Sequence, residues 1–549
     1  MYPNKMHLAC FEHLFYWVYW ISVILYALYE FASICQSENH LYKINAQAFR
    51  PGSFNDNYYD ASDFEWQSFK KLYTDYWYIV AIHVILSNAL TINNQPTLKL
   101  ISWSLVTLYA TYTVFSLAAL VVVVINVVML ILLAILGKNI LSYTLCFGVV
   151  LASQSTEIAN RIFNPNEPRM TNEFDFEEKR FLFTYCLCFL NARGLSSSLD
   201  NLTIRQKKEI QSSRGEFFDK VVTIAAYLLY LPGFFAGPIY LYNDFEKATR
   251  HVRDEPEKEV FLGRKYFKTM GLLLVLIAQV IYYEYMLHWL YSSAISADHI
   301  IVSGYNAVQF SGFIASLFLL FYLKYTCIYG TFRILANFDG VASIAPPMPQ
   351  CVAAMHLNSQ LWRNFDTGIY NWLRKYVYNP VVARTTNIGG RFLATVVSFG
   401  CIALWHLPLT SPLIMWLGLN LVAAIVELWA RTFARKESWS RFRNQLSRPN
   451  YIRILAFLGL PLFFLAVLSN LYFLSGNELI GEEFMKRVFN SSSCFYFHLL
   501  FALYCGANVS IDYNKVGVDL VPLHGMKQQQ QQQEKKESKT TKLYKKFKL

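Results

Sequence analysis

The sequence predicts an all-α polytopic membrane protein with about ten to twelve membrane segments, some of them re-entrant. Of its 549 residues, 54% are hydrophobic, 17% are aromatic and only 16% are charged, whereas a soluble protein has about 25% charged residues. Residues 14–35 and 116–137 are predominantly apolar runs that are long enough to cross a bilayer as helices. Further apolar stretches lie at 76–92, 98–115, 139–153, 219–242, 270–292, 308–330, 411–430, 452–474 and 494–510.

The first apolar run is expected to remain as a helix, because it is too long for the core of a cleaved signal and no small-residue cleavage site follows it. The chain has ten cysteines, most of them in or beside apolar segments, and no CxxC pair. We therefore expect most of them to pack as small hydrophobic side chains.

Three regions are predicted along the chain. Residues 1–59 contain the first helix and a polar loop, residues 60–512 form the membrane core, and residues 513–549 form a disordered tail. The formal net charge is +12, and residues 525–549 contain eight Lys against two Glu. A basic tail after the last membrane segment is typical of a cytosolic carboxyl terminus, so nucleic acid is not expected as a partner.

The basic loops predict which way the segments face. Residues 431–453 contain seven Arg or Lys against one Glu, and residues 374–391 are also basic, so both are expected in the cytosol. Fifteen residues separate Arg391 from His406, which is roughly 22 Å of helix. His406 should therefore lie deep in the membrane, close to where Pro408 ends the helix. An ionisable side chain at that depth indicates a functional site.

A second polar cluster, at residues 358–378, reads as one helix with Trp362, Asp366, Ile369 and Trp372 on a broad face. Asp366 would then lie on an aromatic stripe. The alternative is structural, with Arg363 and Arg374 as its counter-ions. An Asp and a His that enter the membrane from opposite sides suggest a polar tunnel through the protein.

The loop at residues 337–356 has three prolines in four residues, and Cys351 follows two residues after the last of them. The prolines exclude a helix there. A thiol displayed after a rigid turn could be acylated, could bind a metal or could be packed, and packing is the commonest outcome.

Several blocks together resemble the membrane-bound O-acyltransferase superfamily, and within it the Hedgehog acyltransferase branch. The resemblance extends from about residue 60 to 512 and rests on WRNFDTGIYNWLRKYVY (362–378), LWH (404–406), LSNLYFLSGNE (468–478), ASDFEWQSF (61–69), APPMPQCV (345–352) and GPIYLYNDF (237–245). It implies a helical bundle of this superfamily around a tunnel, in the endoplasmic reticulum or Golgi membrane.

The resemblance also implies roles for individual residues. His406 matches the catalytic histidine, Asp366 an essential acidic residue, Asn470 an asparagine of the reaction chamber, and Cys351 a cysteine that binds haem iron. Trp362, Arg363 and Trp405 are candidates for lining the tunnel. Two departures, Leu407-Pro408 after His406 and the glycine-free NPVVARTT at 379–386, leave the substrate channel less well defined than the chemistry.

The implied reaction moves palmitate from palmitoyl-CoA to the amino-terminal cysteine of a secreted Hedgehog-type or EGF-like signalling protein, forming an amide. An α-amino group titrates at about 7.7–8.0, so a histidine near neutrality suits the removal of its proton. Asn470 could donate to the developing oxyanion. Asp366 could polarise the surroundings of the thioester or order a water.

Other functions compete with this one. A related acyltransferase could act on a serine hydroxyl or a lipid alcohol with the same histidine. A transporter or a catalytically silent scaffold is the alternative from another class, because intramembrane His and Asp residues are common in transporters. The sequence has no internal repeat of the kind that transporters commonly show. It also keeps His406, which a silent relative would be expected to lose.

Overall fold

A computed structural model describes residues 10–37, 48–54, 57–137, 139–163, 175–207, 214–254, 259–385, 387–490 and 493–520. Most of these residues are helical, as predicted. The exception is a small antiparallel pair of strands, β1 (Phe49–Pro51) and β2 (Tyr58–Asp60), in which Phe49 pairs with Asp60.

The longer helices of the first half are α1 (Cys10–Cys35), α3 (Phe64–Asp75), α4 (Trp77–Ile92), α5 (Pro96–Val114), α6 (Leu117–Leu136), α7 (Asn139–Ser153), α8 (Thr156–Ile162), α9 (Phe176–Lys207), α10 (Arg214–Leu228), α11 (Tyr242–Asp254) and α12 (Glu259–Met286). The second half contains α13 (Ser292–Ser296), α14 (His299–Ser303), α15 (Ala307–Phe338), α16 (Asn358–Asn364), α17 (Thr367–Leu373), the π-helical turn η5 (Arg374–Tyr378), α18 (Asn379–Ala383), α19 (Ile388–Trp405), α20 (Ser411–Phe433), α21 (Glu437–Gln445), α22 (Arg448–Leu458), α23 (Leu460–Ser475), α24 (Glu478–Asn490) and α25 (Ser493–Leu520). Short 3-10 turns η2 (Leu231–Gly233), η3 (Ala342–Ile344) and η4 (Val352–Ala354) connect some of them.

Fewer helices than predicted are long and apolar enough to cross a membrane. The described residues contain six, within α1, α6, α12, α15, α19 and α20, or up to eight if the bent pairs α3–α4 (62°) and α22–α23 (41°) each form one span. The predicted ten to twelve segments, some of them re-entrant, are therefore not confirmed. The predicted segment 219–242 is interrupted, because α10 ends at Leu228 and Pro232 lies in the turn η2. The predicted segment 139–153 has the bounds of α7, which at 15 residues is shorter than the helices that pass this test.

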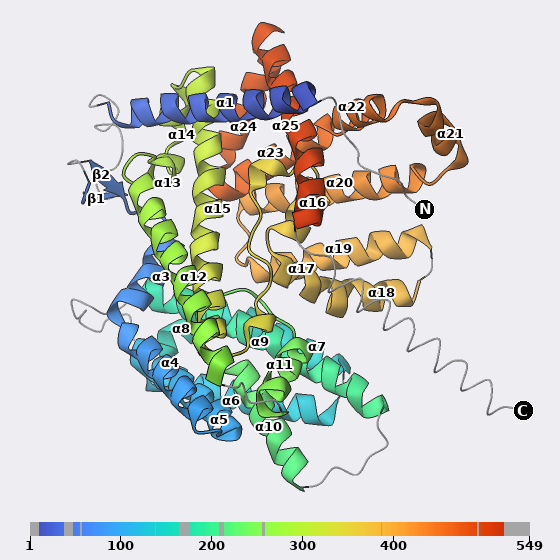
Figure 1. Cartoon of the computed structure of the whole chain (residues 1–549). Coiled ribbons are helices and arrows are strands. Elements are labelled where there is room, and N and C mark those ends of the chain that lie inside the picture. The colour runs from blue at the N-terminus through green and yellow to red at the C-terminus, as the bar shows by residue number, and fades with distance from the viewer. Residues whose placement is uncertain are drawn as a thin grey trace, which may run out of the picture.

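Helix α15 passes through the centre of the molecule (Figure 1). Its 32 residues span roughly 48 Å. It packs closely on α1, because a Cβ added at Gly312 would lie 2.0 Å from the carbonyl oxygen of Ala27. A side chain there would force the two helices apart.

A fully buried polar network holds the carboxyl end of α15. Asp339, which caps this helix, lies 2.9 Å from Nε2 of His83 and accepts a hydrogen bond of 2.6 Å from the hydroxyl of Tyr230. The ammonium of Lys99 donates to the Asp339 carbonyl oxygen at 2.7 Å. Since buried polar groups are stable only when they are satisfied, these bonds place α15 against α4, α5 and the segment after α10.

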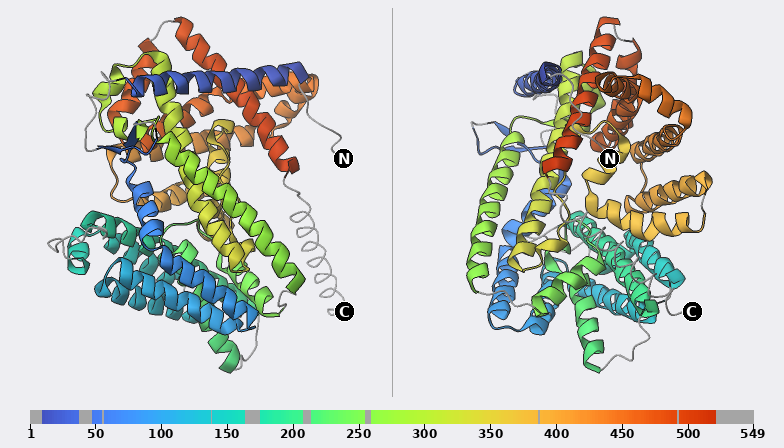
Figure 2. Two further views of the ribbon diagram at one scale, coloured as in Figure 1. Left: turned by 60° about the vertical axis from the view of Figure 1, so that its left-hand side comes forward. Right: turned by 45° about the vertical axis from the view of Figure 1, so that its right-hand side comes forward.

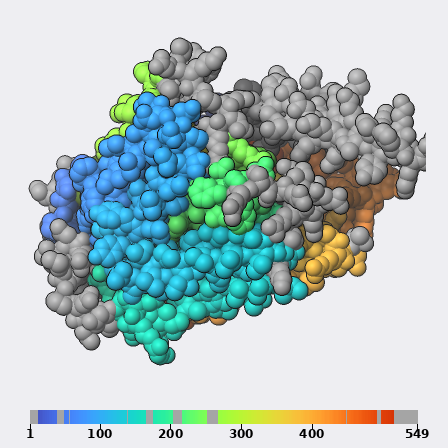
Figure 3. All heavy atoms as spheres, turned by 90° about the horizontal axis from the view of Figure 1, so that it is seen from below, coloured from blue at the N-terminus to red at the C-terminus, as the bar shows by residue number. Residues whose placement is uncertain are grey.

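The amino-terminal helices α4 to α9 gather at one end of the molecule, and the carboxyl-terminal helices α20 to α25 at the other, with α12 and α15 running between them (Figure 2). Seen from below, the coloured surface of the first end consists largely of residues from the amino-terminal third (Figure 3). The segments predicted to face the cytosol, around α18 and α21, lie on the side opposite the β1–β2 hairpin (Figure 1).

Two predicted boundaries differ from the structure. The single helix expected over residues 358–378 is wrong, because α16 ends at Asn364 and α17 begins at Thr367. Helix α25 continues to Leu520, so the first residues of the segment predicted as a disordered tail are helical. Residues 521–549, with most of the Gln- and Lys-rich sequence, lie outside the described residues.

Candidate functional site

A cavity of about 670 Å³ lies among α3, α9, α15, α16, α17, α19, α20 and α23. Five of the seven site residues predicted from the sequence line it, although they come from four separate helices and the turns next to them. They are Trp362, Asp366, Trp405, His406 and Asn470. The fold therefore brings together residues that are far apart in the sequence, since Trp362 and Asn470 are separated by 108 positions.

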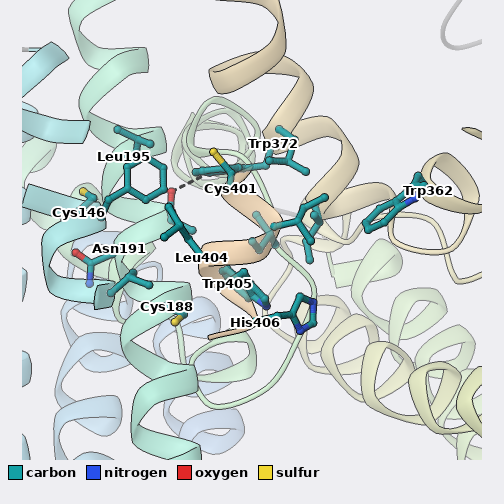
Figure 4. Close-up of a pocket in the computed structure, with 17 residues that line it drawn as sticks. Cys146, Cys188, Asn191, Leu195, Trp362, Trp372, Cys401, Leu404, Trp405 and His406 are labelled. Carbon is teal, nitrogen blue, oxygen red and sulfur yellow. Dashed lines mark hydrogen bonds between the residues drawn. The ribbon is translucent and has the colours of Figure 1, made fainter. Parts of the chain in front are cut away.

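A smaller cavity of about 80 Å³ adjoins this site between α7, α9, α17 and α19. Its lining is mostly apolar and includes Cys146, Leu195, Trp372 and Cys401 (Figure 4). Some residues line both cavities, among them His406, Trp405, Trp362, Ile369 and Cys188. The histidine thus stands where a roomy, partly polar cavity meets an apolar crevice.

His406 occupies the position that caps the carboxyl end of α19. The predicted end of this helix, just before Pro408, is confirmed. The imidazole packs edge-on against Trp416, with 5.1 Å between ring centroids, and against Phe473, with 5.5 Å. Within the described part of the chain neither ring nitrogen has a protein hydrogen-bond partner. The two aromatic rings thus fix the imidazole and leave its nitrogens available to a substrate.

Asp366 lies in the break between α16 and α17, where its carboxylate caps α17. One oxygen accepts a 2.9 Å hydrogen bond from the backbone N–H of Ile369, and the other accepts a hydrogen bond from the hydroxyl of Tyr329 on α15. Capping by an Asp side chain satisfies a helix N–H that otherwise has no partner, which explains why a helix begins here. Arg363 and Arg374 are exposed, and neither forms an ion pair with Asp366, so the counter-ion alternative has no support.

Asn470 is 8% exposed on α23. Its side-chain amide donates a 2.7 Å hydrogen bond to the carbonyl oxygen of Ala466, one turn earlier. An amide NH₂ has two hydrogens, so one remains for a group in the cavity. The backbone bond orients the amide in advance.

The two tryptophans predicted to line a tunnel form aromatic walls of the cavity. Trp405 packs edge-on against Phe189, with 5.0 Å between ring centroids. The indole N–H of Trp362 donates to the side-chain oxygen of Asn420 at 3.3 Å, and its ring lies 5.7 Å from that of Trp416. These contacts fix both rings beside His406.

The sequence did not single out the polar residues that α3 and α15 contribute to the cavity. Lys324 lies 2.9 Å from Asp63 and 2.8 Å from Glu65, and the hydroxyl of Tyr325 donates to Glu65 at 3.0 Å. Asp63 and Glu65 belong to the ASDFEWQSF block, one of those on which the family resemblance rests, so the sequence could have indicated these two residues. Tyr329 is one aromatic residue in a long apolar segment, and no pattern marks it.

Two predicted residues lie apart from this cavity. Arg363 is exposed, with its guanidinium 5.6 Å from the ring centroid of Tyr370, and lines neither described cavity. Cys351 is a free, half-buried cysteine directly before η4, and it lines neither cavity either.

The surroundings of Cys351 bear on the predicted haem ligand. Burial raises the pKa of its thiol, while the backbone N–H groups of Ala353 and Ala354 act in the opposite direction by hydrogen bonding. Backbone N–H donors favour the thiolate form that a metal ligand requires. Burial is the larger effect, so the pKa of Cys351 stays above its usual value and the thiol would lose its proton on binding iron.

Residues 219–469 match the model of MBOAT, the membrane-bound O-acyltransferase family. This range includes Cys351, Asp366 and His406, and it ends one residue before Asn470.

Three curated relatives illustrate the similarity. The chain is 29% identical over 317 residues to "Protein-cysteine N-palmitoyltransferase Rasp" of Drosophila melanogaster, covering 57% of this chain and 59% of that protein. It is 28% identical to "Protein-cysteine N-palmitoyltransferase HHAT" of Mus musculus, covering 48% and 52%. It is 26% identical to "Membrane-bound O-acyltransferase GUP1" of Millerozyma farinosa, covering 60% and 64%. The matches thus span little more than half of the first two relatives.

Proposed function

We propose that this chain, whose residues 219–469 match the membrane-bound O-acyltransferase family, is a protein-cysteine N-palmitoyltransferase. It would move palmitate from palmitoyl-CoA to the amino-terminal cysteine amine of a secreted Hedgehog-type or EGF-like signalling protein in the endoplasmic reticulum or Golgi. The observation that carries this proposal is the gathering of His406, Asp366 and Asn470 on one cavity. The relatives that are named as palmitoyltransferases support the choice of acceptor.

In the proposed reaction the amine nitrogen attacks the thioester carbonyl carbon. A carbon–nitrogen bond forms, the carbon–sulfur bond breaks, and the products are an amide and CoA thiol. His406 would accept the proton that the nitrogen loses and pass it to the departing CoA thiolate. This role needs an imidazole nitrogen without a protein partner, which is how His406 lies in the cavity.

Asn470 would stabilise developing charge, and Asp366 would position the substrates. The remaining amide hydrogen of Asn470 would donate to the carbonyl oxygen as negative charge develops on it. Asp366 is held by Tyr329 and by the backbone of α17, so its carboxylate has one fixed orientation. It would hold the incoming amine, or a water beside it, rather than move a proton itself.

The apolar crevice suggests where the acyl chain lies. Its lining of Leu195, Trp372, Cys146 and Cys401 favours a hydrocarbon over a polar group. Because His406 lies at the junction of the two cavities, a thioester at the mouth of the crevice would meet the amine in the larger cavity. A tunnel through the two cavities would admit acyl-CoA from the cytosol and the peptide from the lumen.

We propose Cys351 as a thiolate ligand for haem iron, at a site separate from the cavity. The iron of a bound haem would form a bond to the Cys351 sulfur, and this bond would tie the loop at 337–356 to the cofactor. No step of acyl transfer passes through it.

A second candidate is transfer to an oxygen, on a serine hydroxyl or a lipid alcohol. The similarity to the GUP1 O-acyltransferase, at nearly the same identity, favours it. The same three residues would serve, since a hydroxyl also loses a proton as it attacks.

One experiment separates the two acceptors. Purified protein is incubated with labelled palmitoyl-CoA and with peptides that begin with Cys, Ser or Ala, or with lipid alcohols. Label in a peptide product that survives alkaline hydroxylamine, which cleaves both esters and thioesters, supports the amide. Label only in an ester would contradict it.

A further inference from the structure

The link between α20 and α22 joins two candidate membrane spans, so it would lie at a membrane surface. Helix α20 (Ser411–Phe433) can cross a membrane by its length and composition, and the bent pair that begins at Pro449 in α22 passes the same test. The residues between them, which include the nine-residue helix α21, therefore connect two candidate spans. In Figure 1, α21 lies at the rim of the molecule.

This link carries cations that no carboxylate neutralises. Arg441 pairs with Glu437 at 3.3 Å. Arg435, Lys436 and Arg443 are exposed, and no Asp or Glu of the described chain lies within ion-pair distance of them. Three exposed charges of one sign on a short segment create a local positive field.

Aromatic rings lie among these cations. Trp439 lies 5.7 Å from Phe433, 5.4 Å from Phe442 and 6.4 Å from Tyr451, measured between ring centroids. The ammonium of Lys436 lies 5.6 Å from the ring centroid of Phe433, and the guanidinium of Arg443 lies 5.5 Å from that of Tyr451. Aromatic rings with adjacent cations are typical of a segment in the headgroup layer.

We propose that Arg435, Lys436 and Arg443, with the ring of Trp439, form a binding surface for anionic phospholipid headgroups. The rings would enter the headgroup layer, and the three cations would contact lipid phosphate and carboxylate groups. Charge complementarity selects this occupant, because a zwitterionic headgroup brings no net charge to three unpaired cations. The surface is separate from the acyl-transfer cavity, whose lining includes none of these residues.

The test counts phosphatidylserine that stays bound. Protein is reconstituted in nanodiscs of phosphatidylcholine with added phosphatidylserine and extracted in mild detergent, and the retained lipids are quantified by mass spectrometry. We expect phosphatidylserine to be enriched over its share in the nanodisc. The triple variant Arg435→Gln, Lys436→Gln, Arg443→Gln should lose most of this enrichment. Each cation that is removed should lower the retention of phosphatidylserine by up to about five-fold. Added salt should lower the enrichment of the unaltered protein.

A matched control removes the same charge elsewhere. Arg161, Lys247 and Arg250 are exposed and each pairs with a carboxylate of its own helix, so replacing all three by Gln should leave the enrichment unchanged. Equal retention by the protein and the triple variant, or an equal loss in the control, would overturn the proposal. So would weaker binding of palmitoyl-CoA by the triple variant in nanodiscs of phosphatidylcholine alone, since the surface would then bind nucleotide phosphates.

Discussion

Tyr329, in the carboxyl-terminal third of α15, donates a hydrogen bond to the carboxylate of Asp366, in the break between α16 and α17. Both residues line the cavity that contains His406. The carboxylate has a second donor in the backbone N–H of Ile369, so it is held from two sides by different elements. Tyr329 is therefore a positioning residue for Asp366.

Removing the hydroxyl tests this relationship. Tyr329→Phe should lower kcat for palmitoyl transfer by about ten-fold or more, since a hydrogen bond to a charged group contributes about 1.5–3 kcal/mol. The measurement is steady-state transfer from labelled palmitoyl-CoA. In an Asp366→Asn background the same substitution should have little further effect, because the two changes then remove one interaction. Tyr325→Phe, which removes a bond to Glu65 instead, is the matched control.

His406 is expected to be indispensable for transfer. His406→Ala should lower the rate by about 10²–10⁴-fold, the usual contribution of general acid–base catalysis, while palmitoyl-CoA still binds. Single-turnover transfer and direct binding of palmitoyl-CoA separate these two properties. The exposed His498 offers a control, since His498→Gln should leave both unchanged. Near-normal turnover by His406→Ala would exclude the general-base role.

Asn470 is expected to act on the transition state. Asn470→Asp keeps the size of the side chain and removes its NH₂ group, so the developing oxyanion would lose a donor and meet a negative charge. We expect kcat to fall by about 10²–10³-fold with a much smaller change in KM. If KM rose and kcat stayed the same, Asn470 would bind the substrate in its ground state instead.

The convergence of Asp366 and His406 could be predicted because the charge pattern of the loops orients the segments and because charged groups are costly in a membrane. The depth of His406 follows from its distance along the chain to the basic loop that contains Arg391. That part of the prediction depends on composition and spacing alone. The cavity that both residues line agrees with it.

The break at Asp366 and the bond from Tyr329 could not be predicted in the same way. Hydrophobic periodicity continues across residues 358–378, whereas the backbone follows the local preference of an Asp side chain to cap a helix. The bond from Tyr329 depends on how α15 lies beside α17, which no pattern within either segment records. Apolar content alone also does not reveal a Pro-Gly turn such as η2, which interrupts the predicted segment 219–242.

If Cys351 binds haem iron through its thiolate, the visible absorbance of the haem should depend on this residue. Purified protein expressed with ample haem should show a Soret band, and Cys351→Ala should lose or shift it. Cys401, also half-buried, is the matched control, and Cys401→Ala should keep the band. A featureless visible spectrum would return Cys351 to the role of a packed thiol.

The acceptor atom is the last prediction, because two routes lead to the same amide. In one the amine attacks directly; in the other the cysteine thiol is acylated first and the acyl group then shifts to nitrogen. An unperturbed thiol titrates at about 8.5 and an α-amino group at about 7.7–8.0, so the amine is the more available nucleophile at neutral pH. A base at His406 serves it directly, and we expect direct amidation.

A peptide that begins with Ser should then be acylated slowly but measurably at nitrogen, and an amino-terminally acetylated Cys peptide should not react. The products are distinguished by hydroxylamine, which cleaves a thioester and leaves an amide intact. Abundant thioester on the acetylated peptide would establish the route through sulfur instead.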